Sequence, residues 1–180
     1  LHISFRTFKG YPHVLNGVNV HVNKKERISI VGETGCGKTT TVNAIAQILA
    51  RQARIDKGEI YFKGKDVLTM PQKELKRVRA ENVSIIFQDP IASLNPVFTI
   101  GQQLKEVIRY SGIEGAGDKK VQEEKAISAL KETSLPDPER IMDSYPFQLS
   151  GGMRQRICIA MSLATPRDLV MADEPTTNLD

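Results

Sequence analysis

Alternation of apolar and polar residues near the N-terminus predicts an antiparallel sheet. Val20 and Val22 alternate with polar neighbours, as in a strand that is buried on one face only. Lysine-glycine pairs at residues 57–58 and 63–64 are expected to form turns. We therefore predict antiparallel strands over residues 3–8, 18–22 and 59–63.

Continuous apolar runs predict a second set of strands, of the parallel type that is buried on both faces. These runs occupy residues 28–31, 83–87 and 169–172. Apolar residues at helical spacing predict helices between the strands. The helices are expected over residues 40–54, 100–110 and 119–133, and from Met153 to Ala164. Strands and helices that alternate in this way indicate an α/β fold.

Glycines and a lysine after the first apolar run have the spacing G-x-x-x-x-G-K-T, the Walker A pattern of nucleoside-triphosphate sites. Glycine lets the main chain approach phosphate closely, and successive N–H groups can then form an anion-binding nest. Lys38 is placed to reach the β- and γ-phosphates, and the Thr39 hydroxyl to ligate Mg²⁺. The predicted nucleotide-binding residues of this loop are Gly32, Glu33, Thr34, Gly35, Cys36, Gly37, Lys38, Thr39 and Thr40.

Two acids, Asp173 and Glu174, directly follow the last apolar run. In a phosphate-loop protein, the first such acid holds Mg²⁺ and the second polarises the attacking water as a general base. The same dipeptide also occurs in ordinary surface turns, so its meaning depends on the loop upstream. With that loop present, we predict a site for ATP and Mg²⁺ in which Lys38 and Glu174 are catalytic.

Taken in order, these motifs resemble those of the ATP-binding cassette (ABC) ATPases over essentially the whole chain. Gln88 follows the second apolar run as the glutamine of the family's Q-loop does. The family's signature motif is matched by Leu149, Ser150, Gly151, Gly152 and Met153. The D-loop is matched by Asn178, Leu179 and Asp180.

The resemblance implies a P-loop NTPase fold with a RecA-like parallel core, an N-terminal antiparallel β part and an inserted helical subdomain. It assigns residues 1–88 and 165–180 to the ATP-binding core and residues 89–164 to the helical subdomain. The family also carries a switch histidine well beyond the Walker B acids, which a chain ending at Asp180 does not contain. We therefore expect a C-terminally truncated fragment that binds nucleotide better than it hydrolyses it.

The family's mechanism implies a role for each matched position. Phe8 would stack on adenine, with Tyr11 as the second candidate, although Phe8 could instead fill the core of a strand. Gln88 would contact Mg²⁺ and the attacking water. Ser150 and the two glycines after it would bind the γ-phosphate of ATP held by the opposite subunit. Ser150 could also be the N-cap of the following helix, and the two roles are compatible.

The segment between the Q-loop and the signature resembles that of dipeptide, oligopeptide and nickel importers. It lacks the sustained heptads of the repair and chromosome ATPases. In importers, the region from Asp89 to Thr99 receives the membrane permease, although it could be only an irregular surface loop. The implied partners are a second ABC ATPase, identical or homologous, a permease and, indirectly, an extracellular substrate-binding protein. The resemblance therefore also implies that the protein lies peripherally on the cytoplasmic face of the membrane.

Two other classes of function stay open: a soluble ABC ATPase that acts on nucleic acid or ribosomes, and a nucleotide switch without catalysis. Basic residues that could contact DNA are Lys73, Lys76, Arg77 and Arg79, but a solvated helix face explains them too. The net charge of +4 is mild, and we expect no nucleic-acid partner. Cys36 and Cys158 lie far apart, which favours reduced thiols over a disulfide. No apolar run is long enough to span a bilayer.

Overall fold

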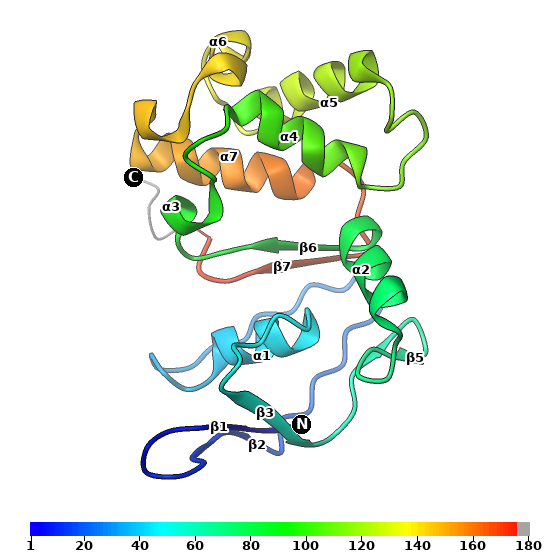
Figure 1. Cartoon of the computed structure of the whole chain (residues 1–180), viewed down its shortest axis with the longest axis vertical. Coiled ribbons are helices and arrows are strands. Elements are labelled where there is room, and N and C mark those ends of the chain that lie inside the picture. The colour runs from blue at the N-terminus through cyan, green and yellow to red at the C-terminus, as the bar shows by residue number, and fades with distance from the viewer. Residues whose placement is uncertain (176–180) are drawn as a thin grey trace. The chain divides into compact units, whose positions relative to one another are not determined.

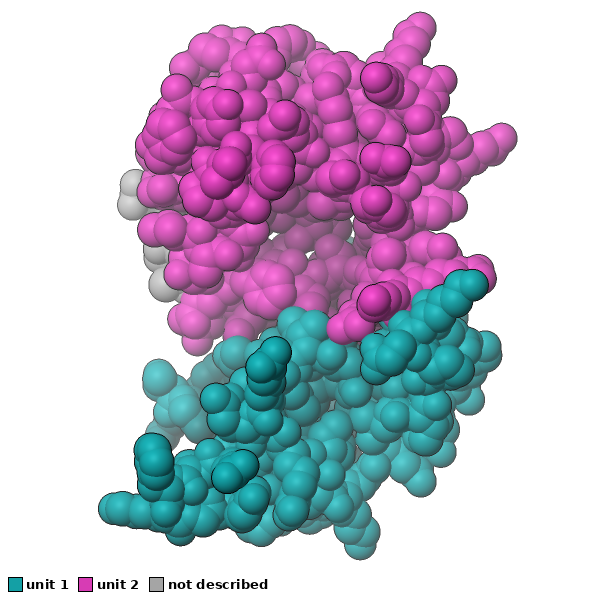
Figure 2. Space-filling model, in the orientation of Figure 1, with its two compact units in different colours: residues 1–75 teal, residues 76–180 magenta. Residues whose placement is uncertain are grey.

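The computed structural model describes residues 1–175. The chain divides into two compact units, residues 1–75 and residues 76–180, which Figure 2 distinguishes by colour. Figure 1 shows the helices and strands of each unit. The predicted division into an ATP-binding core and a helical subdomain stays a prediction.

The first unit is built on a three-stranded antiparallel sheet with the order β2-β1-β3. Its strands are β1 (His2–Phe5), β2 (His13–Asn16) and β3 (Ala53–Lys57). The hairpin of β4 (Tyr61–Phe62) and β5 (Lys65–Asp66) and the helix α1 (Lys38–Ile45) complete the unit. Ile3 of β1, Leu15 of β2 and Ala44 of α1 are fully or almost fully buried and form its core. The core therefore joins the helix that follows the phosphate loop to the sheet.

Two strands predicted in this unit are absent from it. Residues 18–22 form no strand: both edges of the central strand β1 are taken by β2 and β3, and none of the described strands pairs with these residues through an outer edge. Residues 28–31 form no strand either, and Val31 is 91 % exposed. A strand needs a neighbour for its N–H and C=O groups, and no described strand of this unit pairs with these residues. The strand predicted over residues 59–63 shortens to β4.

The helix predicted over residues 40–54 is also too long, since α1 ends at Ile45. Gln47 has a left-handed backbone (φ +56°), and both its main-chain and side-chain N–H groups donate to the carbonyl of Ala44. Residues 53–57 then pair with β1. Pairing within the sheet thus takes the backbone groups that a longer helix would have used.

The second unit contains a two-stranded parallel sheet of β6 (Val83–Ile86) and β7 (Leu169–Ala172), in which Val83 pairs with Leu169 and Ile86 with Ala172. Parallel neighbours require a crossover connection, which is helical here. Its elements are α3 (Pro90–Ser93), α4 (Ile100–Arg109), α5 (Lys119–Glu132), α6 (Pro138–Asp143), a short 3₁₀ turn (Pro146–Gln148) and α7 (Gly151–Leu163). The helix α2 (Gln72–Glu81) spans the boundary of the two units.

Helices α4 and α5 match their predicted limits to within one residue, and local capping explains why. Thr99 forms a capping box with Gln102 at the start of α4, and Asp118 accepts a hydrogen bond from the Lys120 N–H at the start of α5. Both helices place fully buried side chains in one core with α7, among them Leu104, Ile108, Leu130 and Ile157. This core holds α7, and therefore the signature residues at its start, in place.

Candidate functional site

The phosphate loop lies against strand β2, and this contact requires glycine. Gly35 and Gly37 have left-handed backbones with φ of +85° and +101°. A Cβ atom at position 37 would lie 2.6 Å from Leu15 Cδ2 and 3.3 Å from the Val14 carbonyl oxygen. A Cβ atom at Gly32 would lie 2.6 Å from Cys36 Sγ, so the loop also closes tightly on itself. The glycines of the Walker A pattern are thus used for close approach as well as for backbone freedom.

Helix α1 begins at this loop with its first N–H groups free of any side-chain cap. Its N-cap is Gly37, which has no side chain, and no acidic residue occurs in the first turn. Unpaired N–H groups and the positive end of the helix dipole favour an anion at this position. The Lys38 Nζ donates to the carbonyl oxygens of Gly32 (2.8 Å) and Glu33 (3.1 Å), which holds the ammonium group over the loop. These features fit a bound phosphate.

The structure distinguishes the two aromatic candidates for adenine stacking. Phe8 lies in the turn that a bridge between Thr7 and Gly10 closes, and its side chain is fully exposed. The alternative that Phe8 fills the core of a strand is therefore wrong. Tyr11 is also exposed, but the Arg54 guanidinium lies 5.0 Å from its ring centroid. Phe8 stays our predicted adenine contact, since it is the more exposed of the two rings.

In the second unit, Gln88 and Glu174 meet at the carboxyl ends of the two parallel strands. Gln88 Nε2 donates to Glu174 Oε2 at 2.8 Å, although the two residues are 86 positions apart in the chain. The N–H of Asp173 donates to the carbonyl of Ile86 at 2.9 Å and extends the ladder between β6 and β7. This edge of a parallel sheet is where α/β proteins bind ligands. The residues predicted for the Q-loop and for the general base are thus in direct contact.

The Asp173 side chain fits a metal-bound role. It is 8 % exposed, and among residues 1–175 its carboxylate has no hydrogen-bond or ion-pair partner. The oxygens of Asp173 are not among the buried polar atoms without a partner, so they keep some access to solvent and to a hydrated cation. No three metal-ligating side chains cluster within the described residues. A site with one carboxylate suits Mg²⁺, which keeps several waters and substrate oxygens as ligands.

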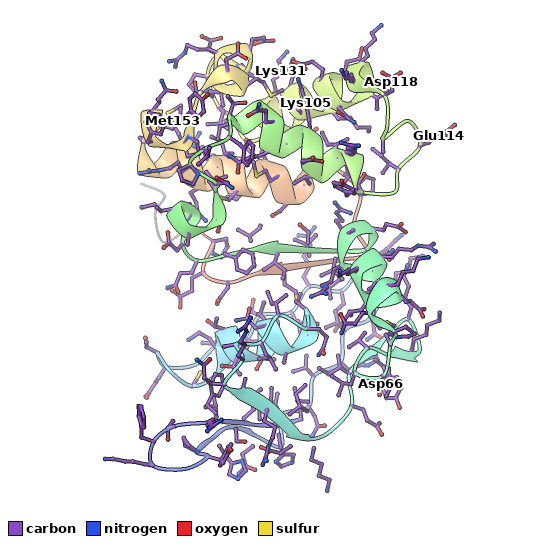
Figure 3. The ribbon with its side chains drawn as sticks, viewed as in Figure 1. Asp66, Lys105, Glu114, Asp118, Lys131 and Met153 are labelled. Carbon is purple, nitrogen blue, oxygen red and sulfur yellow. The ribbon has the colours of Figure 1, made fainter. Side chains whose placement is uncertain are left out.

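The signature residues form the start of helix α7. Ser150 is the N-cap, and its side chain accepts a hydrogen bond from the Met153 N–H at 3.3 Å. Met153, labelled in Figure 3, lies in the first turn of the helix. Leu149 is buried, whereas Gly151 is exposed, with no atom within 4 Å of a Cβ placed there. The N-cap role of Ser150 is confirmed, and its phosphate role stays a prediction.

Two further points concern residues near these motifs. The predicted D-loop, Asn178 to Asp180, lies outside the described residues. Gln155 of α7 was not predicted, yet its side chain is fully buried and its Nε2 donates to the carbonyl oxygen of Pro175 at 2.7 Å. Its position could have been noticed from the sequence, because it follows Gly151 by four residues and precedes Cys158 by three. It therefore shares one helix face with the buried Cys158.

Comparison with known proteins agrees with these motifs. The sequence model of the family described as "ABC transporter" matches residues 15–177. The probable peptide ABC transporter ATP-binding protein y4tR of Sinorhizobium fredii is 44 % identical over 92 % of the chain and 49 % of its own length. The oligopeptide transport ATP-binding protein OppD of Bacillus subtilis is 42 % identical over 100 % of the chain and 50 % of its own. The chain thus spans about half the length of these relatives.

Solved structures agree at the level of the fold. The dimeric post-hydrolysis state of the ATP-binding cassette MJ0796, bound to ADP and Pi, superposes with a TM-score of 0.88. It is 27 % identical in sequence, and the match covers 99 % of this chain and 73 % of the other. The fold class predicted from the sequence, a P-loop NTPase of the α/β type, is confirmed.

Proposed function

This chain belongs to the ABC transporter family, and from that membership we propose that it is the ATP-binding and ATP-hydrolysing part of an importer for dipeptides or oligopeptides. The relatives that carry this proposal are named as peptide transport ATP-binding proteins. They favour peptides over nickel, the other cargo whose importers the sequence resembles. The hydrolytic part of the proposal rests on one observation, the hydrogen bond between Gln88 and Glu174.

Each residue of the ATP site has a role that follows from its chemistry. The phosphate loop and the N-terminus of α1 bind the phosphates through main-chain N–H groups, and Lys38 adds a mobile positive charge. Thr39, Asp173 and Gln88 would hold Mg²⁺, which would neutralise charge at the β- and γ-phosphates. Glu174 accepts a proton from the attacking water, and the Gln88 amide orients that carboxylate.

The signature residues serve a second copy of the ATPase, identical or homologous. The exposed Gly151 at the start of α7 leaves main-chain N–H groups open to an anion. A γ-phosphate from the facing subunit suits this position. Support comes from the matched cassette MJ0796, whose structure is a dimer. Closure of such a dimer over ATP excludes water, and hydrolysis removes the bridging phosphate so that the dimer reopens.

The segment from Asp89 to Thr99 presents apolar side chains that suit a permease contact. Ile91, Val97 and Phe98 are exposed. The segment is nevertheless well held, because Gln103 Nε2 donates to the carbonyls of Asn95 (2.9 Å) and Phe98 (3.0 Å). Asp89 caps the short helix α3. An ordered loop with exposed apolar residues favours a docking surface over an irregular solvent loop.

We place the protein at the cytoplasmic face of the cell membrane, bound through a separate permease. Within residues 1–175, none of the helices has both the length and the apolar character that crossing a bilayer requires. The alternative of a nucleic-acid ATPase has less support, since the basic helix α2 is partly neutralised. Its Arg77 pairs with Glu81 at 3.0 Å, and Glu74 adds a second negative charge to the same helix.

The proposal is tested on the full-length protein, tagged and extracted from membranes in mild detergent. We expect a multi-span permease and a second ABC ATPase to copurify. The complex should hydrolyse ATP in the presence of Mg²⁺, and Lys38→Ala and Glu174→Gln should each lower the rate at least about tenfold. Recovery of soluble partners or nucleic acid alone would overturn the importer assignment. Unchanged hydrolysis in Glu174→Gln would overturn the assigned chemistry.

A further inference from the structure

The backbone at Glu174 has an unusual conformation. Its φ is +48°, in the left-handed region that non-glycine residues rarely adopt. The next residue is Pro175, and a residue before proline is further biased towards extended conformations. A backbone of this kind persists only when its surroundings hold it. The contacts around Glu174 therefore decide where its carboxylate lies.

Hydrogen bonds hold this turn on both sides of Glu174 as well as at its side chain. Before it, the Asp173 N–H donates to the carbonyl of Ile86 at 2.9 Å. At the side chain, Gln88 Nε2 donates to the carboxylate at 2.8 Å. After it, Gln155 Nε2 donates to the carbonyl of Pro175 at 2.7 Å. Gln155 is thus the helix α7 residue that fixes the far end of the turn.

The burial of Gln155 is not explained by stability alone. The residue is 0 % exposed, and its Oε1 is buried without a hydrogen-bond partner among the described residues. A buried amide of which one half is unpaired is unfavourable, whereas an apolar side chain of similar size would fill the same space without that cost. Gln155 supplies the hydrogen bond to Pro175, which an apolar residue could not form.

We propose that Gln155 is a positioning residue for ATP hydrolysis, which keeps the Glu174 carboxylate in place through the Pro175 carbonyl. Gln155 follows Gly151 by one helical turn on α7. The helix that begins with the signature residues therefore also holds the general base of its own subunit. A movement of α7 when the facing subunit's ATP binds or leaves would shift Glu174 through this single hydrogen bond. The inference rests on the proposed ATPase function.

The test is Gln155→Met in the full-length protein assembled with its permease. Methionine keeps the size of the side chain and removes the donor. We expect kcat to fall on the order of 10- to 100-fold, the effect of a slightly misplaced catalytic group, while KM for ATP and the Kd for nucleotide stay within about twofold. If Gln155 acts through Glu174, adding Gln155→Met to Glu174→Gln should lower the residual rate no further.

Gln122→Met is the matched control. Gln122 of α5 is also buried, and its Nε2 donates to the Ala116 carbonyl at the same distance, 2.7 Å. This control removes an equivalent buried amide donor from a helix that carries none of the predicted ATP-site residues, and it should keep its kcat. Should Gln155→Met fail to fold, Gln155→Asn keeps the amide, shortens its reach by one methylene and should give the same loss of kcat.

Two kinds of failure are distinguishable. If the wild-type complex does not hydrolyse ATP, or Glu174→Gln is as active as wild type, the proposed function fails. If the wild type and Glu174→Gln behave as expected, but Gln155→Met keeps the wild-type kcat or lowers the rate further in the Glu174→Gln background, the positioning role alone is refuted.

Discussion

Replacing Gly37 with alanine tests how the phosphate loop is fitted to the sheet, and Gly35→Ala is its control. Both glycines have left-handed backbones, but a Cβ at Gly35 has no atom within 4 Å, whereas one at Gly37 lies 2.6 Å from Leu15 Cδ2. Leu15 is only 2 % exposed, so it cannot move aside freely. We expect Gly35→Ala to lower the free energy of unfolding by about 1–2 kcal/mol, from backbone strain alone. Gly37→Ala should lower it by roughly 2–5 kcal/mol, because overpacking adds about 1–3 kcal/mol.

The assay is urea unfolding of the nucleotide-free protein, followed by circular dichroism. With a slope of about 1–3 kcal/mol per molar urea, the midpoints of the two variants should differ by on the order of 1 M. Nucleotide is left out so that a loss of phosphate binding does not contribute to the difference. Equal midpoints for Gly35→Ala and Gly37→Ala would show that Leu15 yields to the methyl group, and would refute the packing argument.

Four further predictions concern helix α7 and the cysteines. Ser150→Asp should keep the N-cap and the free energy of unfolding, whereas Ser150→Ala should lower that free energy by about 1 kcal/mol. In Ser150→Asp, a carboxylate would face the phosphate and should abolish the ATP-dependent dimerisation that light scattering measures. A normal dimer of Ser150→Asp would argue against the phosphate role. Burial raises the pKa of the Cys158 thiol to about 11. Only the exposed Cys36 should therefore react with a thiol reagent at pH 8, and Cys36→Ser should remove the fast reaction. Because the folded state holds that proton more tightly, the stabilising contribution of Cys158 should persist below pH 9 and decline as the pH rises towards 11. Ile157→Ala, at a fully buried position, should lower the free energy of unfolding by about 2–5 kcal/mol, and the half-exposed Leu163→Ala by less than about 1 kcal/mol in the same urea assay.

The elements that the sequence predicts well are those with local causes. Helices α4 and α5 have their caps, Thr99 and Asp118, within their own segments. Strands depend instead on partners elsewhere in the chain. Val20 and Val22 have the alternation of a strand, but β2 and β3 already occupy both edges of β1. Residues 28–31 have the apolar character of a buried strand and no strand pairs with them in the described unit.

The residues of the candidate site also differ in how far the sequence predicts their positions. The meeting of Gln88 and Glu174 is predictable, because each follows a parallel strand at the same edge of a sheet. The phosphate loop is recognisable from its spacing alone, although the role of Leu15 in requiring Gly37 is not. The spacing of three residues to Cys158 places Gln155 on the buried face of α7, although a glutamine in a helix usually lies in solvent. Only the packing of α7 shows that its amide faces Pro175.

The Gln103 side chain has a consequence for the kinetics and thermodynamics of assembly. By bonding to Asn95 and Phe98, it restricts the conformations of the loop before any partner arrives. Binding at the proposed permease contact would therefore have little conformational entropy left to remove from this loop. Complex formation should be governed by dehydration of Ile91, Val97 and Phe98, and should show a negative heat-capacity change without the large unfavourable entropy of coupled folding. Loosening the loop with Gln103→Ala would weaken association without removing a single residue that touches the partner.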